Sequence, residues 1–388
     1  MRPALVLCAL AGLAGVAAAI DTEPTNNTFA GGDPIALLVG GSGVNGAELT
    51  AGGADLDHFL INLDQGEILV TVTSPLDVPF NVPDTVLGGF DPSGLLLGTN
   101  DDAGANNSGL AERGSCVRML ATFPGLHGVG VTGFPDFTFS AAHTEAGRYF
   151  MTLARISATP TLGGDFADSP GNSLVSSADP LGLSGVDAVS AVCELDAAGA
   201  DLDYYSVSMA AGDILTVATT PLVPFGNAPD TVAGIFDSTG LSIITNDDAG
   251  TDLGSGLAVR GSVLRFVAPA PGTYYVGVSG FPDFSFTGAH TEAGLYHLVV
   301  SLISSAPPAC RPDLTTGAIA GQPGYGVPNG VLNNDDFFYY LAQFAAGNVA
   351  VADLTTGAIP GQPGYGVPNG ILNNDDFFYY LAIFAAGC

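Results

Sequence analysis

Carboxylate and amide side chains recur at fixed positions near the C-terminal end of the chain. The peptide at 313–348, "DLTTGAIAGQPGYGVPNGVLNNDDFFYYLAQFAAGN", returns at 353–388 with 32 of 36 positions identical. A helix-loop-helix calcium loop places oxygen ligands at loop positions 1, 3, 5, 7, 9 and 12, with glycine at 6, because it must wrap a hard cation and turn sharply midway. The spacing predicts an interrupted version of this loop, with calcium as its ion, in each copy.

The predicted calcium ligands are the same residue types in both copies, apart from one backbone carbonyl. A long insertion separates the second ligand of each loop from the third. With two or three carboxylates per loop, binding is expected to be weak, with a Kd of about 10⁻⁴ to 10⁻³ M. In the alternative, "VPNG" is only a turn and "NNDD" only a helix cap. The ligand sets are Asp313, Thr315, Asn329, Val331, Asn333 and Asp336, then Asp353, Thr355, Asn369, Ile371, Asn373 and Asp376.

A short helix is predicted after each pair of acids. Phe337, Leu341 and Phe344 fall at i, i+4 and i+7, which is the apolar stripe of an amphipathic helix. We expect Asn334 to cap this helix and Gly347 to end it. A helix of about eleven residues is marginal alone, so the two copies are expected to pack together.

A longer internal repeat organises the rest of the chain. "ADLDHFLINLDQGEILVTVTSPLDVPF" from Ala54 returns as "ADLDYYSVSMAAGDILTVATTPLVPF" from Ala200. Apolar residues alternate with period two in segments such as "ILVTVTS", and Gly, Pro and Asp turns separate these segments. The pattern predicts a mainly β fold with two tandem antiparallel, jelly-roll-like β-sandwiches of about 120 residues each. We place them at 20–157 and 181–305, with a linker at 158–180 and the loop-helix module at 310–388.

Further polar clusters recur in both repeats. Asp55 and Asp57 alternate along an extended segment, so both carboxylates project from one face. A strand edge guarded by charge is the alternative explanation. The "NDDAG" stretches, with acids at 101–102 and 247–248, are predicted to form turns rather than sites.

Histidine and glutamate recur in "AHTEAG", as His143 with Glu145 and as His290 with Glu292. Zinc binding or acid-base chemistry would need a second histidine near each, and neither copy supplies one at the spacing of a zinc protease. We therefore predict a loop held by its own side-chain hydrogen bonds.

Charge and targeting signals limit the possible partners. The chain has 38 acidic residues against 8 basic ones, no lysine, and a formal net charge of −30. This charge disfavours nucleic acid and anionic lipid, and it favours divalent cations. Residues 1–19, "MRPALVLCALAGLAGVAAA", read as a secretory signal peptide, and no later apolar run is long enough to cross a membrane. An exported protein is expected.

Four cysteines remain after the predicted cleavage, namely Cys116, Cys193, Cys310 and Cys388. An even number in an exported chain suggests disulfides, and four cysteines permit three pairings. Cys116 and Cys193 are unpaired within their own repeats, so they either bridge the two repeats or stay buried as free thiols.

The two repeats resemble the bacterial pre-peptidase C-terminal (PPC) domain. The resemblance is carried by "DTEPTNNTFA", "ADLDHF", "FDPSG", "NDDAG" and the closing "GRYFMTL" or "GLYHLVV". It implies a β-sandwich of the kind commonly appended to secreted enzymes and surface proteins. In the family fold Glu23 and Asn26 lie near Asp55 and Asp57, which implies a calcium site at the entrance of the first repeat. The second repeat departs from the motif there, with "DSPGNS".

Residues 310–388 resemble a dockerin, specifically the planctomycete kind that ends in Gly-Cys. That family joins two loop-helix units between two cysteines, as Cys310 and Cys388 stand here. The resemblance implies calcium-stabilised folding and attachment to an anchoring protein at the cell surface or outside the cell. A Cys310 to Cys388 disulfide would close the module; otherwise Cys388 stays free as a covalent anchoring handle.

Catalytic signatures are missing from the sequence. There is no G-x-S-x-G elbow, P-loop or dinucleotide fingerprint. We therefore predict an exported, non-catalytic, calcium-dependent binding or spacer protein of the cell surface or extracellular matrix, with a polysaccharide or protein as possible ligand. The alternatives are a secreted polysaccharide hydrolase, which would use paired acids, and a structural coat component.

Overall fold

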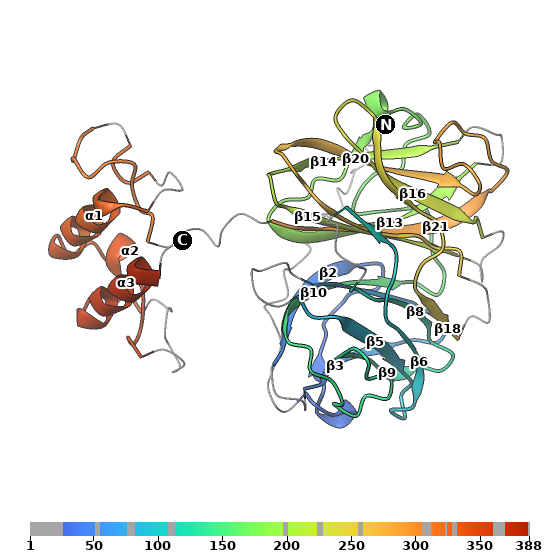
Figure 1. Ribbon diagram of the computed structural model, residues 1–388, viewed down its shortest axis with the longest axis horizontal. Coiled ribbons are helices and arrows are strands. Elements are labelled where there is room, and N and C mark those ends of the chain that lie inside the picture. Colours follow the sequence, from blue (N-terminus) through green and yellow to red (C-terminus); the bar gives the residue numbers. More distant parts are fainter. Residues whose placement is uncertain are drawn as a thin grey trace, which may run out of the picture. The chain divides into compact units, whose positions relative to one another are not determined.

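The computed structural model describes residues 26–50, 55–75, 82–107, 113–196, 201–222, 228–254, 259–304, 312–322, 324–327, 332–359 and 369–386. The chain divides into two compact units, Met1–Ser304 and Ser305–Cys388 (Figure 1). The larger unit is mainly β and contains both long repeats. The smaller unit is helical. The predicted signal peptide lies outside the described residues.

Each repeat forms an outer and an inner sheet. The outer sheet of the first repeat has the strand order β1 (Asp33–Pro34), β3 (Asp57–Leu63), β9 (Gly125–Gly133), β5 (Thr85–Phe90) and β6 (Leu96–Asn100). Its inner sheet has the order β18 (Thr251–Leu253), β8 (Cys116–Leu120), β4 (Ile68–Pro75), β10 (Gly147–Ile156) and β2 (Ser42–Leu49). A 3-10 turn, η1 (Phe29–Gly31), precedes β1.

The second repeat follows the same plan. Its inner sheet has the order β11 (Gly163–Gly164), β13 (Val186–Leu195), β21 (Gly294–Ile303), β15 (Ile214–Pro221), β19 (Val263–Val267) and β7 (Ala105–Asn106). Its outer sheet has the order β12 (Asp179–Pro180), β14 (Asp203–Met209), β20 (Gly272–Gly280), β16 (Thr231–Phe236) and β17 (Ser242–Asn246). The 3-10 turn η2 (Val175–Ser177) precedes β12.

The four sheets stack as four layers, with the two inner sheets in the middle (Figure 1). One apolar cluster fills the space between the two sheets of each repeat. A third cluster fills the seam between the inner sheets and includes Val70 and Val72 of β4 and Val263 of β19. The inner strands are therefore buried on both faces, as in a covered sheet.

Each repeat lends a short strand to the other. After "NDDAG" of the first repeat, β7 pairs in parallel with β19 of the second. After the equivalent stretch of the second repeat, β18 pairs in parallel with β8 of the first, and Leu253 enters the first repeat's core. This reciprocal exchange explains why both repeats lie in one compact unit.

A buried arginine crosses the seam in each direction. Arg118 of the first repeat donates to the carbonyls of Thr219, Ala249 and Ser262. Its counterpart, Arg265 of the second repeat, donates to the equivalent carbonyls of the first repeat, Thr73, Ala103 and Ser115. Hydrogen bonds from a charged donor to buried carbonyls are strong, so these contacts lock the seam.

The segment predicted as a linker packs against the second repeat. It contains β11, η2 and β12, and Phe166 lies in the second repeat's core. The carboxylate of Asp165 accepts from Ser190 N and from the Ser42 hydroxyl. Residues 163–180 thus supply the start of the second repeat, as residues 29–34 do in the first.

The smaller unit contains α1 (Asn334–Ala345), the short α2 (Val349–Ala352) and α3 (Asn374–Ala386). Tyr340 and Tyr380, at the same position in the two copies, stack with ring centroids 3.8 Å apart and planes 8° from parallel. The predicted pairing of the two helices is therefore present in the structure. The helix cap was predicted one residue late, because the side chain of Asn333 accepts from Asp335 N.

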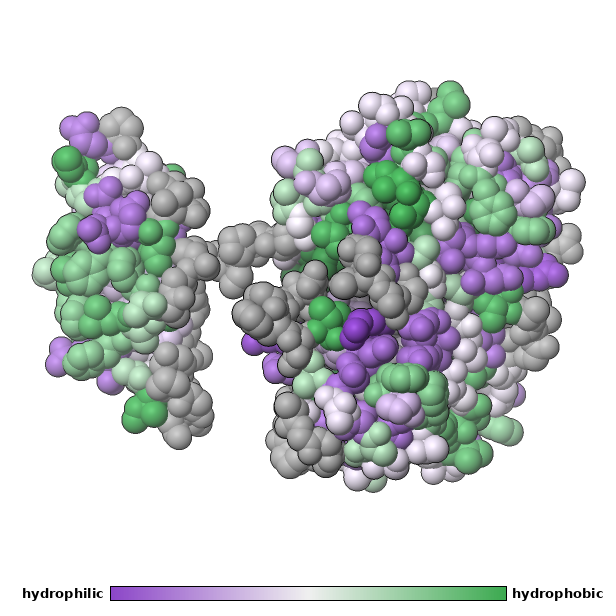
Figure 2. Space-filling model, viewed as in Figure 1, coloured by the Kyte–Doolittle hydropathy of each residue, from purple (hydrophilic) through white to green (hydrophobic). Residues whose placement is uncertain are grey.

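No helix among the described residues is long and apolar enough to cross a membrane. On the face shown in Figure 2, hydrophobic residues form small separate areas among hydrophilic ones on the larger unit.

Candidate metal centre

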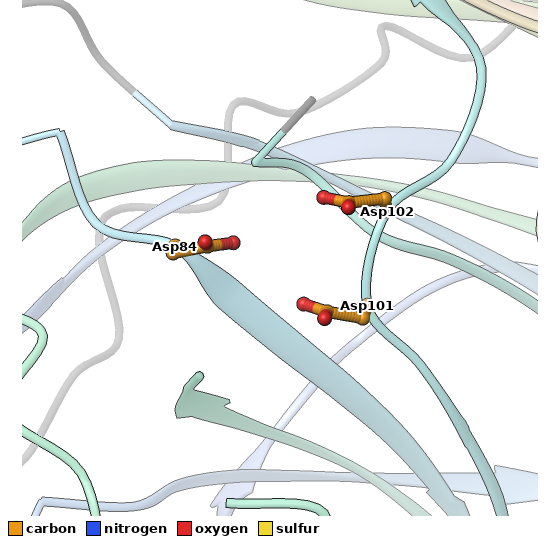
Figure 3. Close-up of side chains that lie close together, drawn as sticks. All are labelled: Asp84, Asp101 and Asp102. Atoms are coloured by element: carbon orange, nitrogen blue, oxygen red, sulfur yellow. The ribbon is translucent and has the colours of Figure 1, made fainter. Parts of the chain in front are cut away.

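Three aspartates converge at one end of the first repeat's outer sheet. Asp84 immediately precedes β5, and Asp101 and Asp102 follow β6. Figure 3 shows their carboxylates pointing toward one another. One carboxylate oxygen from each residue lies within 4.8 Å of the others. We call this group the first Asp triad.

The hairpin and the neighbouring strand hold the triad in place. β5 and β6 are antiparallel, with Leu87 opposite Asn100, so the residues beyond both strand ends come together. The Asn100 side chain accepts from Cys116 N at 2.8 Å, and the Ser115 hydroxyl donates to the Asp101 carbonyl. The "NDDAG" stretch is therefore fixed against β8.

Two carboxylate oxygens of the triad have no hydrogen-bond donor among the described residues. Asp84 Oδ1 and Asp101 Oδ1 are buried atoms without a hydrogen-bond partner. Burial, followed by repulsion from Asp102 and Asp84, raises the pKa of Asp101 to about 6. Burial and the Asp102 charge also raise the pKa of Asp84, although Arg113 opposes the shift. A bound cation would offset both burial and repulsion. Its positive charge would reduce the repulsion between the carboxylates, and the buried oxygens without donors would coordinate it.

The second repeat contains the same arrangement. Asp230, Asp247 and Asp248 form a second Asp triad under the same 4.8 Å criterion. Asp230 Oδ1 and Asp247 Oδ1 are again buried without a partner. Burial and the charges of Asp248 and Asp230 raise the pKa of Asp247 to about 6. Two sequences that differ at many positions thus build one geometry twice.

The "HTEAG" loops support these triads. The Glu145 side chain accepts from Asp84 N at 2.8 Å, and the Glu292 side chain accepts from Asp230 N at 2.7 Å. His143 and His290 contact the carbonyls of Asp55 and Asp201, each at 2.8 Å. The histidine and glutamate side chains thus have a structural role, but they bond to other segments of the chain and not to their own loop as predicted.

The chemistry of the triads suits a hard divalent cation. Calcium and magnesium take oxygen ligands, and three carboxylates supply up to six oxygens. Within the described residues, these two triads are the only groups of three or more His, Cys, Asp or Glu side chains that meet the distance criterion.

The entrance site predicted for the first repeat is only partly described. Asp57 is fully buried, and its carboxylate accepts from the Tyr149 hydroxyl at 2.6 Å and from the Asn26 amide at 3.3 Å. Asp55 Oδ2 accepts from Thr50 N, and Asp55 Oδ1 is buried without a partner. Glu23 lies outside the described residues. The structure therefore brings together Asn26 and Asp57 of the predicted set.

The second repeat was expected to lack this entrance site, because "DSPGNS" departs from the family motif. Polar side chains nevertheless meet at the equivalent position. Asp168 accepts from the Tyr205 hydroxyl at 2.9 Å and from the Asn172 amide at 3.4 Å. Asp203 accepts from the Tyr296 hydroxyl at 2.6 Å, and burial and the Asp168 charge raise its pKa well above the usual range. An acidic cluster is thus present at this entrance too.

In the helical unit the predicted carboxylate ligands hold backbone groups. Asp336 accepts from the N–H groups of Leu314, Thr315 and Asn333, and Asp376 does the same for Leu354, Thr355 and Asn373. These contacts tie the start of each loop to its helix and complete a capping box at α1.

The remaining predicted loop residues are also engaged. The Thr315 hydroxyl donates to the Gly317 carbonyl, as the Thr355 hydroxyl does to Gly357, and Asp313 is buried. Asp353 accepts from Asn369 N, and the Asn369 side chain accepts from Ile371 N. Asn373 caps α3 by accepting from Asp375 N, as Asn333 does at α1. Asn329 and Val331 lie outside the described residues.

The cysteines do not bridge the repeats. Cys116 and Cys193 are free and buried. Cys116 lies in the seam cluster, whereas Cys193 lies in the core of the second repeat. The proposed Cys116 to Cys193 disulfide is therefore wrong, because the two thiols belong to different cores. Cys310 and Cys388 lie outside the described residues, so their pairing stays a prediction.

"NDDAG" was predicted to form a turn, and Asp84 and Asp230 were not among the predicted site residues. The available signal was the hairpin itself: "PD" precedes one strand, "DD" follows the next, and five residues connect the strands in both repeats. Antiparallel pairing of these two strands places the acids before the first strand next to the acids after the second.

One comparison with known proteins identifies a domain. The family model described as the bacterial pre-peptidase C-terminal domain matches residues 201–280, within the second repeat. No curated protein matches. Among solved structures, the periplasmic g-type lysozyme inhibitor PliG of Aeromonas hydrophila is 19% identical over 32% of this chain and 93% of its own, with a TM-score of 0.22.

Two larger structures are also similar. The plant receptor-like kinase FER is 6% identical over 64% of this chain and 81% of its own, with a TM-score of 0.19. The CBM22-1-CBM22-2 tandem of Paenibacillus barcinonensis Xyn10C is 9% identical over 63% of this chain and 82% of its own, with a TM-score of 0.20. At these scores the likeness supports no inference about function. Residues 201–280 are thus similar to the pre-peptidase C-terminal family.

Proposed function

We propose that this chain is an exported, non-catalytic, calcium-dependent binding or spacer protein of the cell surface or extracellular matrix. In this proposal both long repeats are PPC-like domains, and the helical unit is a dockerin-like module that attaches the chain to an anchoring protein. The observation that carries the calcium part is the pair of Asp triads, each with buried carboxylate oxygens that lack donors.

The composition supports a cation as the ligand of the triads. With a net charge of −30 and no lysine, the chain has few internal cations to neutralise its carboxylates. Extracellular calcium is abundant enough for sites with a Kd of about 10⁻⁴ to 10⁻³ M. Calcium at each triad would also hold together two ends of a hairpin, namely those of β5 and β6 in the first repeat. The exchanged strand β7 begins just after this point.

Calorimetric calcium titration of the mature chain tests the proposal. The variant D101N/D247N keeps the shape of both triads and removes one charge from each, so we expect two calcium ions fewer per chain. The control is D91N/D237N, because these half-buried acids occupy equivalent turns and an asparagine oxygen can still accept the same N–H groups. Unchanged stoichiometry in D101N/D247N would remove the triads from the proposal.

The helical unit needs a separate variant. Asp336 and Asp376 hold backbone groups, so replacing them disturbs the fold whether or not metal binds. D313N/D353N is a milder test of the predicted loops, and it should remove any calcium that remains in D101N/D247N. Release of sugar from polysaccharides by the purified chain, lost in D101N/D247N, would instead favour the hydrolase alternative.

A further inference from the structure

Each repeat exposes two phenylalanines on the same loop. Phe134 and Phe137 are each 42% exposed, and their rings are perpendicular, with centroids 6.0 Å apart and planes at 89°. Phe281 and Phe284 in the second repeat are 43% and 45% exposed, with centroids 6.1 Å apart and planes at 87°. Leaving four large aromatic side chains in water is unfavourable, so their recurrence in both repeats indicates a use. We call each group an aromatic pair.

A third phenylalanine in each loop anchors the pair. Phe139 packs edge-on against Phe90, with centroids 5.1 Å apart, and Phe286 packs the same way against Phe236 at 4.8 Å. Both anchors have positive φ, 54° and 51°, which is costly for a bulky side chain. The sequence "FPDFTF" therefore divides its aromatics into one that holds the loop and two that face outward.

A buried aspartate fixes the loop from inside. The Asp136 carboxylate accepts from the N–H groups of Thr138, Ser140 and Ala142. Asp283 accepts in the same way from Thr287, Gly288 and Ala289. Because the loop is already ordered, a ligand that contacts the aromatic pair loses little free energy in immobilising it.

The surroundings of the pairs are acidic. Phe134 N donates to the Asp84 carbonyl at 2.8 Å, and Phe281 N donates to the Asp230 carbonyl at 2.8 Å, so the loop begins beside the Asp triad. Every arginine that the structure describes contacts a carbonyl or an acid of this chain; they are Arg113, Arg118, Arg148, Arg155, Arg260 and Arg265. The pairs therefore sit in a negative field that repels anionic ligands and attracts cationic ones.

We propose that the two aromatic pairs bind lysine or arginine side chains of a basic segment on a partner protein. The aliphatic stem of such a side chain packs on a ring face, its cationic head interacts with the ring and the negative field, and perpendicular rings offer faces in two directions. This inference rests on the proposed function only in taking the chain to be a binding protein, and it needs no calcium. The pairs follow β9 and β20, which belong to different outer sheets, so each pair is a separate site for one basic side chain.

The test uses the mature chain and a synthetic peptide in which arginine alternates with glycine. Binding is measured in chelator, so that calcium plays no part. F137A/F284A removes one ring from each pair and should weaken binding at each site about two- to fivefold, since one cation–π contact contributes about 0.5–1 kcal/mol. F123A is the control, because Phe123 is 67% exposed and belongs to neither pair. A salt series from about 50 to 300 mM NaCl should weaken wild-type binding.

Non-specific attraction to the acidic surface gives a different result. In that case F137A/F284A would bind the peptide as tightly as wild type, and binding would still weaken with salt. That result overturns the proposal. Binding of a neutral soluble β-glucan that is lost in F137A/F284A, with no effect on the peptide, would assign the pairs to a glycan and also overturn it. F137L/F284L, which keeps apolar area without the π face, should bind as weakly as the alanine variant.

The calcium titration separates this inference from the proposed function. F137A/F284A should bind calcium as wild type does, because no triad residue is changed. D101N/D247N should lose calcium and keep most of its peptide binding. Failure of the calcium predictions would not affect the peptide-binding proposal, and failure of the peptide-binding predictions would not affect the calcium proposal.

Discussion

Each repeat of the larger unit directs an arginine at backbone carbonyls of the other repeat, but the residue opposite that arginine in the strand pairing is a carboxylate in only one of the two cases. Arg118 lies 3.6 Å from Asp252, which pairs with it between β8 and β18. At the equivalent position between β19 and β7, Arg265 pairs with Asn106. The arginine-to-carbonyl hydrogen bonds thus occur in both repeats, whereas the ion pair between Arg118 and Asp252 is an additional contact of one repeat.

Removing each arginine separately should expose this difference most strongly. R118A leaves three buried carbonyls and the carboxylate of Asp252 without the cation, so we expect the free energy of unfolding to fall by about 3–5 kcal/mol. R265A removes the equivalent hydrogen bonds, and its opposite residue, Asn106, carries no charge, so a loss of about 2–3 kcal/mol is expected. Urea unfolding of the mature chain measures both.

A double variant checks the cause of that asymmetry. R118A/D252A should recover part of the loss seen in R118A, because the buried carboxylate is gone. Equal losses in R118A and R265A, or no recovery in the double variant, would show that Asp252 contributes nothing to the seam.

The repeats differ again at a seam position of the central strands. His297 on β21 corresponds to Phe150 on β10. His297 is 2% exposed and lines a cavity of about 420 Å³ together with Ile156 and Val192. Burial lowers its pKa to about 3.

This histidine should make the fold sensitive to acid. Above pH of about 6.5 the imidazole is neutral in both states and adds no pH dependence. As the pH falls toward 3, the unfolded chain binds a proton that the folded chain does not, so stability is lost. At pH about 4 the loss is about 3 kcal/mol, and H297F should remove it.

The reciprocal variant is the matched control. F150H places an imidazole at the equivalent seam position of the first repeat and should add acid sensitivity there. Urea midpoints of wild type, H297F and F150H are compared at neutral and acid pH, so that shared carboxylate effects cancel. Parallel pH curves for wild type and H297F would contradict the prediction.

The sequence carried most of the local structure. Period-two alternation located strands such as β4, and the aromatic run after "NNDD" located α1 and α3, because side-chain patterning follows the burial of each face. The same alternation was less informative about burial: Ile68, Val70 and Val72 were expected to share one face of a two-layer sandwich, and they line a third core between the repeats.

The strand exchange could not be read from the chain. β7 has two residues and β18 has three, and their partners lie in the other repeat. Segments this short carry no periodic signal, and their pairing is decided by long-range packing. The same holds for Arg118 and Arg265, which donate to carbonyls of the strand residues Thr219 and Thr73, about a hundred or more residues away.

The candidate metal centre lies between these cases. The "NDD" acids were seen, but Asp84 joins them only through the register of β5 with β6, which shifts at a bulge between Gly89 and Phe90. A bulge is a tertiary adjustment that this sequence does not announce. Conversely, Asp336 and Asp376 were predicted as calcium ligands from their spacing. In the structure their carboxylates accept hydrogen bonds from backbone N–H groups.

The smallest expected effect concerns the triads taken one at a time. D101N and D247N should each remove one calcium ion and leave the other site unchanged, because the two triads belong to different outer sheets. In chelator each variant should be slightly more stable than wild type, by about 1 kcal/mol or less, since solvent screens the repulsion in a half-exposed cluster. Calcium should reverse this order by stabilising only the intact triads.

The pH dependence sharpens the same comparison. Asp101 and Asp247 have pKa values of about 6, so protons compete with calcium below that pH and the affinity of both sites should fall together. D101N should remove half of this pH-dependent binding and leave the remaining half with an unchanged midpoint. If the midpoint of the remaining site moves, the two triads communicate through the strand exchange, and the repeats are not independent sites.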